Sequence, residues 1–157
     1  MNRHIISVLV ENSSGVLSRI SGLFSRRAYN IHSLTVGPTE DESISRMTIT
    51  VSGDEQVFQQ IKKQLNKLIE VIKIVELEPE KSVCRELMMI RVNSLDYRSN
   101  IMEIANIFRA NIIDVALESL VLELTGDKSK VDAFQTMLLP FGILEVVRTG
   151  VAGLQRG

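Results

Sequence analysis

The spacing of apolar positions changes several times along the first half of the chain. Residues 5–10 form an apolar, β-branched run that ends in the turn formers Glu11-Asn12-Ser13-Ser14-Gly15, which predicts a strand and a loop. From Val16 the apolar side chains recur at helical spacing, and we expect this helix to end near Tyr29 and Asn30. The same reasoning predicts strands at residues 31–36, 44–51 and 71–77, and a helix opened by Gly53-Asp54. The predicted order for this half is βαββαβ.

The second half of the chain repeats this plan. The polar segment 79–82 contains Pro79 and is typical of a linker. Beyond it we expect strands at 86–92, 112–116, 120–125 and 144–148, a helix at 100–109, and a helix that is opened by Gly126-Asp127 and stops before Pro140. The sequence therefore predicts an α+β fold of two tandem ferredoxin-like βαββαβ units, each an antiparallel sheet with two helices on one face. The expected domains are residues 1–78 and 83–157, joined by linker 79–82.

Composition and charge narrow the possible partners. Apolar residues make up 45% of the 157 positions, which can supply a core for one ordinary domain or two small ones. The chain has 18 Lys and Arg against 19 Asp and Glu, a net charge of -1, so no overall field draws it to nucleic acid or anionic lipid. No apolar run has the length of a membrane span, and we expect a cytoplasmic protein, or one inside an organelle stroma. The single cysteine, Cys84, is expected to be a small core residue.

Candidate catalytic and metal-binding patterns are weak. His4 and His32 have no Cys, Asp or Glu at metal-ligand spacing around them. No serine lies in a Gly-x-Ser-x-Gly segment, and Gly15 and Gly22 belong to no phosphate-binding glycine pattern. RNA recognition on a sheet of this plan uses exposed aromatic residues, whereas this chain has five Phe, two Tyr and no Trp.

The loop from Glu11 to Leu17 is the candidate binding segment. A strand that leads into a helix through Asn, two Ser and Gly offers free backbone N–H groups and a positive helix end, which together suit a small carboxylate. The alternative is that Asn12, Ser13 or Ser14 caps the helix and Gly15 turns the chain. Asn30 is also ambiguous, because Asn after a helix commonly takes a left-handed cap conformation. Residue types alone leave both interpretations open.

A resemblance to a known family extends along nearly the whole chain. The segments that carry it include Glu11-Asn12-Ser13-Ser14-Gly15-Val16-Leu17-Ser18-Arg19, Leu23-Phe24-Ser25-Arg26-Arg27-Ala28-Tyr29-Asn30-Ile31, Ser45-Arg46-Met47-Thr48 and Phe108-Arg109-Ala110-Asn111-Ile112-Ile113-Asp114-Val115. They closely resemble acetolactate synthase (acetohydroxyacid synthase) regulatory subunits, whose amino-terminal domain is an ACT domain. The string of segments is specific to this one family, since ACT domains in general share only the fold and the glycine-containing first loop.

The resemblance implies a site for valine where two ACT domains meet side by side in a homodimer. The residues carried over are Asn12, Gly15, Val16 and Leu17 from one chain, with Asn30 and Ile31 from its partner. Backbone N–H groups from Gly15 to Leu17 would receive the valine carboxylate, the two Asn side chains would bridge its polar groups, and Ile31 would face its isopropyl group. The chain departs from common family choices at His32 and Gly37, which leaves valine affinity and selectivity open.

The resemblance also implies that chemistry takes place on another protein. The expected partner is the catalytic large subunit, which would carry thiamine diphosphate, Mg and FAD and convert two pyruvates to acetolactate and CO2. The chain itself would hold no cofactor, metal or catalytic residue, and would bind neither nucleic acid nor membrane. Two alternatives remain: an amino-acid-responsive transcription regulator, which would need a DNA-reading helix-turn-helix, and a free-standing enzyme on the same fold.

Overall fold

The structure is a computed structural model that describes residues 2–27 and 29–157. The chain divides into two compact units: unit 1 is Met1–Val83 with Gly150–Gly157, and unit 2 is Cys84–Thr149. The observed division lies close to the predicted boundary. The main difference is that Gly150–Gly157, part of the expected second domain 83–157, groups with unit 1. Gly150–Gly157 groups with unit 1, where its N–H groups donate to the side chains of Ser33 and Thr48 and to the Lys81 carbonyl.

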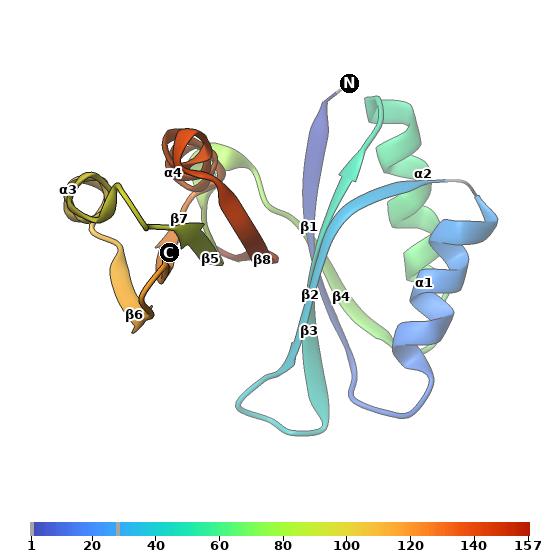
Figure 1. The fold of residues 1–157 in the computed structure, drawn as a ribbon. Coiled ribbons are helices and arrows are strands. Elements are labelled where there is room, and N and C mark those ends of the chain that lie inside the picture. Colours follow the sequence, from blue (N-terminus) through green and yellow to red (C-terminus); the bar gives the residue numbers. More distant parts are fainter. Residues whose placement is uncertain (1, 28) are drawn as a thin grey trace. The chain divides into compact units, whose positions relative to one another are not determined.

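Unit 1 has the predicted βαββαβ order. Its elements are β1 (Arg3–Glu11), α1 (Val16–Arg26), β2 (Asn30–Pro38), β3 (Ile44–Ser52), α2 (Glu55–Asn66) and β4 (Val71–Glu76), followed by the short 3-10 helix η1 (Pro79–Lys81). The strands form an antiparallel sheet in the order β2-β3-β1-β4, and α1 and α2 lie side by side on one face of it (Figure 1). The predicted linker 79–82 is this 3-10 helix and the first residue of the next strand, Ser82.

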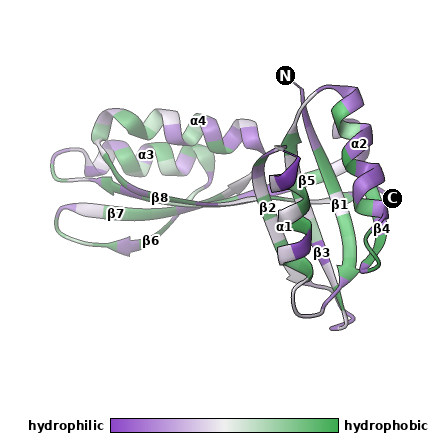
Figure 2. Cartoon of the chain, turned by 90° about the vertical axis from the view of Figure 1, so that its right-hand side faces the viewer, coloured by the Kyte–Doolittle hydropathy of each residue, from purple (hydrophilic) through white to green (hydrophobic). Residues whose placement is uncertain are grey.

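The core of unit 1 follows directly from strand and helix periodicity. Alternate side chains of β1 and β3 face the helices. The buried residues of the two strands and two helices are Ile6, Val8, Val10, Met47, Ile49, Val51, Val16, Ile20, Leu23, Phe24, Phe58, Ile61 and Leu65. Hydrophobic and hydrophilic residues alternate along the helices, as expected for elements with one buried face (Figure 2). Asp54 caps helix α2, because its carboxylate accepts a hydrogen bond from the Val57 N–H at 2.8 Å.

Helix α1 ends earlier than its apolar pattern suggests. The predicted end near Tyr29 and Asn30 is wrong, because α1 ends at Arg26 and Asn30 already pairs with Ser52 as the first residue of β2. The Tyr29 N–H donates to the Phe24 carbonyl at 3.1 Å, which satisfies a carbonyl of the last turn. Ala28, which lies within the predicted helix and within the motif that carries the resemblance, is outside the described residues.

Unit 2 repeats the plan of unit 1. Its elements are β5 (Ser82–Asn93), α3 (Arg98–Phe108), β6 (Asn111–Val115), β7 (Ser119–Gly126), α4 (Lys128–Leu138), the 3-10 helix η2 (Leu139–Phe141) and β8 (Ile143–Gln155). The first two residues of β5 and the last six of β8 group with unit 1. The sheet order is β6-β7-β5-β8, and its core contains Met88, Ile90, Val92, Ile101, Ala105, Leu120, Leu122, Leu124, Val131, Phe134 and Leu138. Asp127 caps α4 as Asp54 caps α2, which confirms the predicted repeat. The main difference is β8, which continues beyond the predicted end at Arg148 into Gly150–Gln155.

Candidate functional site

The loop between β1 and α1 has the backbone geometry that a close approach by a ligand requires. Gly15 is the residue before the first helical position, and its φ of 84° and ψ of -6° lie in the left-handed region that favours glycine. The loop residues and Leu17 are exposed, whereas Val16 is buried in the core of unit 1. Val16 can therefore contribute its backbone to a site at this loop, but not its side chain.

The first turn of α1 is not capped by a side chain. Among the described residues, no side chain accepts a hydrogen bond there, so the capping role considered for Asn12, Ser13 or Ser14 is wrong. The side-chain N–H of Asn12 instead donates to the Glu42 carbonyl at 2.8 Å, in the loop between β2 and β3. The Val16 N–H has a long backbone hydrogen bond to the Ser13 carbonyl, at 3.4 Å. N–H groups at a helix start that lack a close acceptor, together with the positive end of the helix dipole, form an electropositive site for a carboxylate.

The β2–β3 loop holds Asn12 in place. The Asn12 backbone N–H donates to the Ser43 carbonyl at 2.8 Å, so both the main chain and the side chain of Asn12 are fixed to this loop. Ser43 in turn donates its hydroxyl and its N–H to the Asp41 carboxylate at 2.6 and 3.0 Å, and these hydrogen bonds hold the pKa of Asp41 below its ordinary value. The Asn12 amide nitrogen donates to this loop, and the side-chain oxygen is the acceptor that an ammonium group could use.

Arg19 adds a positive charge that was not among the predicted site residues. Its Nη1 lies 3.8 Å from the position that a Cβ on Gly15 would occupy, and its Nη2 contacts the Glu70 carboxylate at 2.5 Å. Glu70 holds the guanidinium beside the glycine, and half of the Arg19 side chain stays exposed to solvent. The sequence did contain a signal that places Arg19 near Gly15. Arg19 is four residues after Gly15, and residues four apart lie on the same face of a helix.

Asn30 and Ile31 lie at the other end of the sheet. Asn30 pairs with Ser52 and Ile31 with Val51, whereas Glu11, where β1 leads into the loop, pairs with Ile44. At about 3.3 Å per residue, the two ends of β3 are about 26 Å apart. The left-handed cap conformation considered for Asn30 is wrong, because Arg109 is the non-glycine residue with positive φ in the described part of the chain. Within one chain, the structure therefore brings Asn12, Gly15, Val16 and Leu17 together and keeps Asn30 and Ile31 apart from them.

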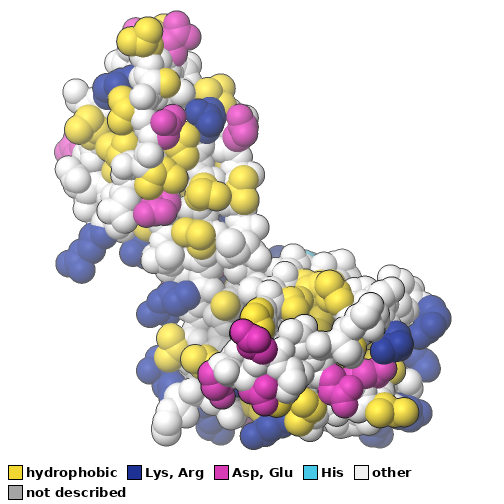
Figure 3. Space-filling model, turned by 90° about the horizontal axis from the view of Figure 1, so that it is seen from below, with side chains coloured by type: hydrophobic (Ala, Val, Ile, Leu, Met, Phe, Trp, Pro, Cys, Tyr) yellow, Lys and Arg dark blue, Asp and Glu magenta, His cyan; other side chains and the backbone are white. Residues whose placement is uncertain are grey.

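Metal-binding clusters and membrane-spanning helices are absent from the described residues. In 2–27 and 29–157, no group of three or more His, Cys, Asp or Glu side chains is placed to hold a metal ion. No helix in these ranges is both long enough and apolar enough for a membrane crossing. Positive and negative side chains are interspersed on the face shown in Figure 3, in keeping with the net charge of -1.

Comparison with known proteins assigns both units to one family. The sequence model of the AHAS small subunit-like ACT domain matches residues 6–73, and that of the small subunit of acetolactate synthase matches residues 85–157. The acetolactate synthase small subunit of Mycobacterium bovis is 53% identical over 155 residues, which cover 98% of this chain and 92% of that protein. The Haemophilus influenzae acetolactate synthase small subunit is 47% identical over 157 residues, covering 99% of this chain and 96% of that protein.

A solved structure gives the same assignment. The crystal structure of the acetolactate synthase small subunit from Thermotoga maritima matches with a TM-score of 0.94 and 40% identity, covering 100% of this chain and 99% of that chain. Sequence and structure thus agree along both βαββαβ units. The chain belongs to the family of acetolactate synthase small subunits, and its first unit is an ACT domain.

Proposed function

We propose that this chain is the regulatory subunit of an acetolactate synthase, which activates a separate catalytic subunit and inhibits it when valine is bound. The observation that carries the proposal is the exposed, glycine-initiated N-terminus of α1, uncapped by any described side chain, in an ACT domain of this family. In this proposal the chain supplies no catalytic residue. Thiamine diphosphate, Mg and FAD belong to the catalytic partner.

The loop offers complementary groups for the two charges of an amino acid. The carboxylate of valine would lie against the N–H groups of Gly15, Val16 and Leu17, where the helix dipole and the Arg19 guanidinium both favour an anion. The Asn12 side-chain oxygen would accept from the ammonium. These groups fix the head of the ligand, and its selectivity must come from a second, apolar surface.

A homodimer supplies that second surface. β2 is an edge strand of the sheet in unit 1, and edge strands commonly pair with another chain. If two β2 strands paired antiparallel about a two-fold axis near Leu34, Asn30 of the partner subunit would face Pro38. Pro38 pairs with Ser45, and Ser45 pairs with Val10, close to where β1 enters the loop. The pairing would therefore carry Asn30 and Ile31 of one chain to the end of the sheet where the other chain's Asn12 and Gly15 lie.

The effect on catalysis would arise from a difference in binding free energy. Valine would inhibit by binding more tightly to the assembly whose catalytic subunit is less active. Couplings of about 1 to 3 kcal/mol are typical of allosteric proteins and correspond to effects of about 5- to 150-fold.

The test is reconstitution with the catalytic subunit. We expect no acetolactate from the chain alone, higher acetolactate production when it is added to the catalytic subunit, and loss of that increase as valine is titrated. Leucine and isoleucine, titrated in parallel, measure selectivity. Acetolactate formation by the chain alone, or a catalytic subunit that does not respond to it, would overturn the proposal.

A further inference from the structure

The face of the unit 1 sheet opposite its helices carries polar side chains that the C-terminal segment covers. Ser7, Thr48 and Thr50 are buried there, although they point away from the apolar core. The backbone N–H groups of Val151 and Gly153 donate to the Ser33 and Thr48 hydroxyls at 3.5 and 3.4 Å. The segment thus satisfies polar groups of the sheet at one end, and its last residues lie over a hollow.

This hollow has a volume of about 230 Å³ and a strongly cationic lining. Its walls are formed by Ser7, Leu9, Arg46, Lys73, Val75, Leu77, Leu154 and Gln155. The register of the sheet explains how the two basic residues meet, since Arg46 of β3 and Lys73 of β4 both pair with Leu9 of β1 and flank it on the same face. The remaining walls are one hydroxyl, one amide and a set of aliphatic side chains.

The guanidinium of Arg46 is held in place but only partly engaged. Its Nη1 donates to the Ser7 hydroxyl oxygen at 2.8 Å, and Ser7 is 2% exposed, so one arm of the guanidinium is fixed on a buried group. Arg19 and Arg148 each form an ion pair with a carboxylate, whereas no such pair is found for Arg46 or Lys73 in the described residues. A planar guanidinium fixed on one side presents its remaining N–H donors in the arrangement that matches a carboxylate or phosphate.

We propose that this hollow is a second ligand site, which binds a small oxyanion that carries no positive charge, such as a short 2-oxo acid or inorganic phosphate. Arg46 and Lys73 bind the anionic oxygens, Ser7 and Gln155 add hydrogen bonds, and Leu9, Val75 and Leu77 contact the apolar part of a 2-oxo acid. An amino acid fits poorly, because its ammonium would lie close to two cationic side chains. The site is separate from the proposed valine site, which is formed at the start of α1.

The binding test uses the full chain and four probes at low ionic strength. Sodium pyruvate, inorganic phosphate, alanine and valine are titrated by calorimetry and by NMR, with the amides of Ser7, Lys73, Leu154 and the Gln155 side chain as reporters. Alanine matches pyruvate in carbon number and adds the ammonium, so we expect its affinity to be at least about tenfold lower than that of pyruvate. Saturable binding of pyruvate, phosphate or both at these amides supports the proposal, and the relative affinities identify the ligand class. Lack of saturable binding of both anions, or alanine binding as tight as pyruvate binding, overturns it.

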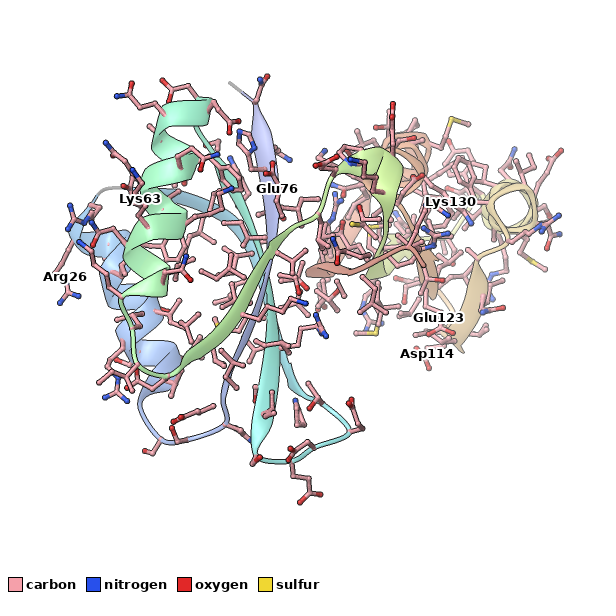
Figure 4. All side chains as sticks on the ribbon, turned by 180° about the vertical axis from the view of Figure 1, so that it is seen from behind. Arg26, Lys63, Glu76, Asp114, Glu123 and Lys130 are labelled. Atoms are coloured by element: carbon pink, nitrogen blue, oxygen red, sulfur yellow. The ribbon has the colours of Figure 1, made fainter. Side chains whose placement is uncertain are left out.

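Substitutions separate a built site from general attraction to positive charge. Lys73→Met removes one charge and keeps most of the side chain, and Lys63→Met is its matched control, because Lys63 projects from α2 away from the sheet (Figure 4). We expect Lys73→Met to weaken anion binding by about threefold to tenfold, and Lys73→Glu to weaken it by more. Anion binding by Lys63→Met should be unchanged, and valine binding should be unchanged in all three variants. Arg46→Met should weaken anion binding most. If its NMR amide shifts differ from those of the wild type only near Ser7, the variant is folded. Equal losses in Lys73→Met and Lys63→Met would overturn the proposal.

Discussion

Gly15 is the residue at which a single substitution separates valine binding from folding most clearly. We expect Gly15→Asp to weaken valine binding by at least about tenfold, because the new carboxylate would lie beside the carboxylate of valine. Two carboxylates about 4 Å apart repel by about 4 kcal/mol at an effective dielectric constant of about 20. Solvent at this exposed loop reduces that repulsion but does not remove it. The new carboxylate would also lie within reach of Arg19, whose Nη1 is 3.8 Å from the Cβ position. The measurement is a valine titration of the reconstituted enzyme, with activation by the variant measured in parallel.

Gly15→Asn is the matched control for this substitution. Asn has the size of Asp and tolerates the left-handed conformation that Gly15 adopts, but it carries no charge. A large loss with Asp and a small loss with Asn would assign the effect to charge beside the ligand. Wild-type valine sensitivity in Gly15→Asp would mean that the effector does not bind at this loop.

Asp132 gives unit 2 a stability that depends on pH. Hydrogen bonds from Lys128 and from Arg148, which also contacts Glu86 at 2.6 Å, hold the pKa of Asp132 below its ordinary value of 3.8. Near and below pH 3.8 the unfolded chain therefore binds more protons at Asp132 than the folded chain does. The stability that Asp132 contributes is fully present above this pH and is lost as the pH falls through the lower pKa of the folded state. We expect Asp132→Asn to reduce the free energy of unfolding at pH 7, and to reduce it by less as the pH falls below 3.8, as measured by urea denaturation. A difference that does not change with pH would contradict this assignment.

At the level of elements, the docking of the C-terminal segment depends on Gly150. Its φ is +85°, and a Cβ there would lie 2.9 Å from the Ser33 Cβ, so the backbone conformation and the packing both favour glycine. We expect Gly150→Ala to destabilise unit 1 by about 1 to 3 kcal/mol and to increase amide hydrogen exchange at Val151 and Gly153. Gly37→Ala, in β2 of the same unit, is the control, because its Cβ would meet no atom within 4 Å. Similar effects of the two substitutions would show that Gly150 has no special role.

Local sequence signals predicted most helices and strands. The features that were not predicted depend on contacts between residues far apart in the sequence. Asp54 and Asp127 could be identified as helix starts because capping is decided within one turn. The extension of β8 was missed because Gly150 and Gly153 are typical of a break, and only their contacts with the unit 1 sheet reveal an extended segment. At the site, the glycine before α1 was predictable from the loop, whereas the position of Asn12 depends on Glu42 and Ser43 in another loop.

At the level of the whole molecule, the two halves of the proposed valine site explain why two chains would be needed. Gly15 follows the end of β1 that pairs with Ile44, and Asn30 pairs with Ser52 at the opposite end of β3. An effector that contacts both must therefore bind between chains, and each dimer would have two such sites related by symmetry. Valine binding would then stabilise the dimer as well as the loop, because a ligand stabilises the assembly that binds it.

Mixing two inactive variants tests this arrangement directly. We expect Gly15→Asp and Asn30→Ala homodimers each to bind valine weakly, because both of their sites carry the substitution. In a dimer with one chain of each kind, one site carries both substitutions and the other carries neither. Random exchange at equal concentrations makes half of the dimers mixed, so about one quarter of all sites should bind valine with wild-type affinity. Calorimetry after co-refolding would count these sites, with each variant refolded alone as the control. If no high-affinity sites return, although mass spectrometry shows mixed dimers, the two residues do not share a site across the dimer.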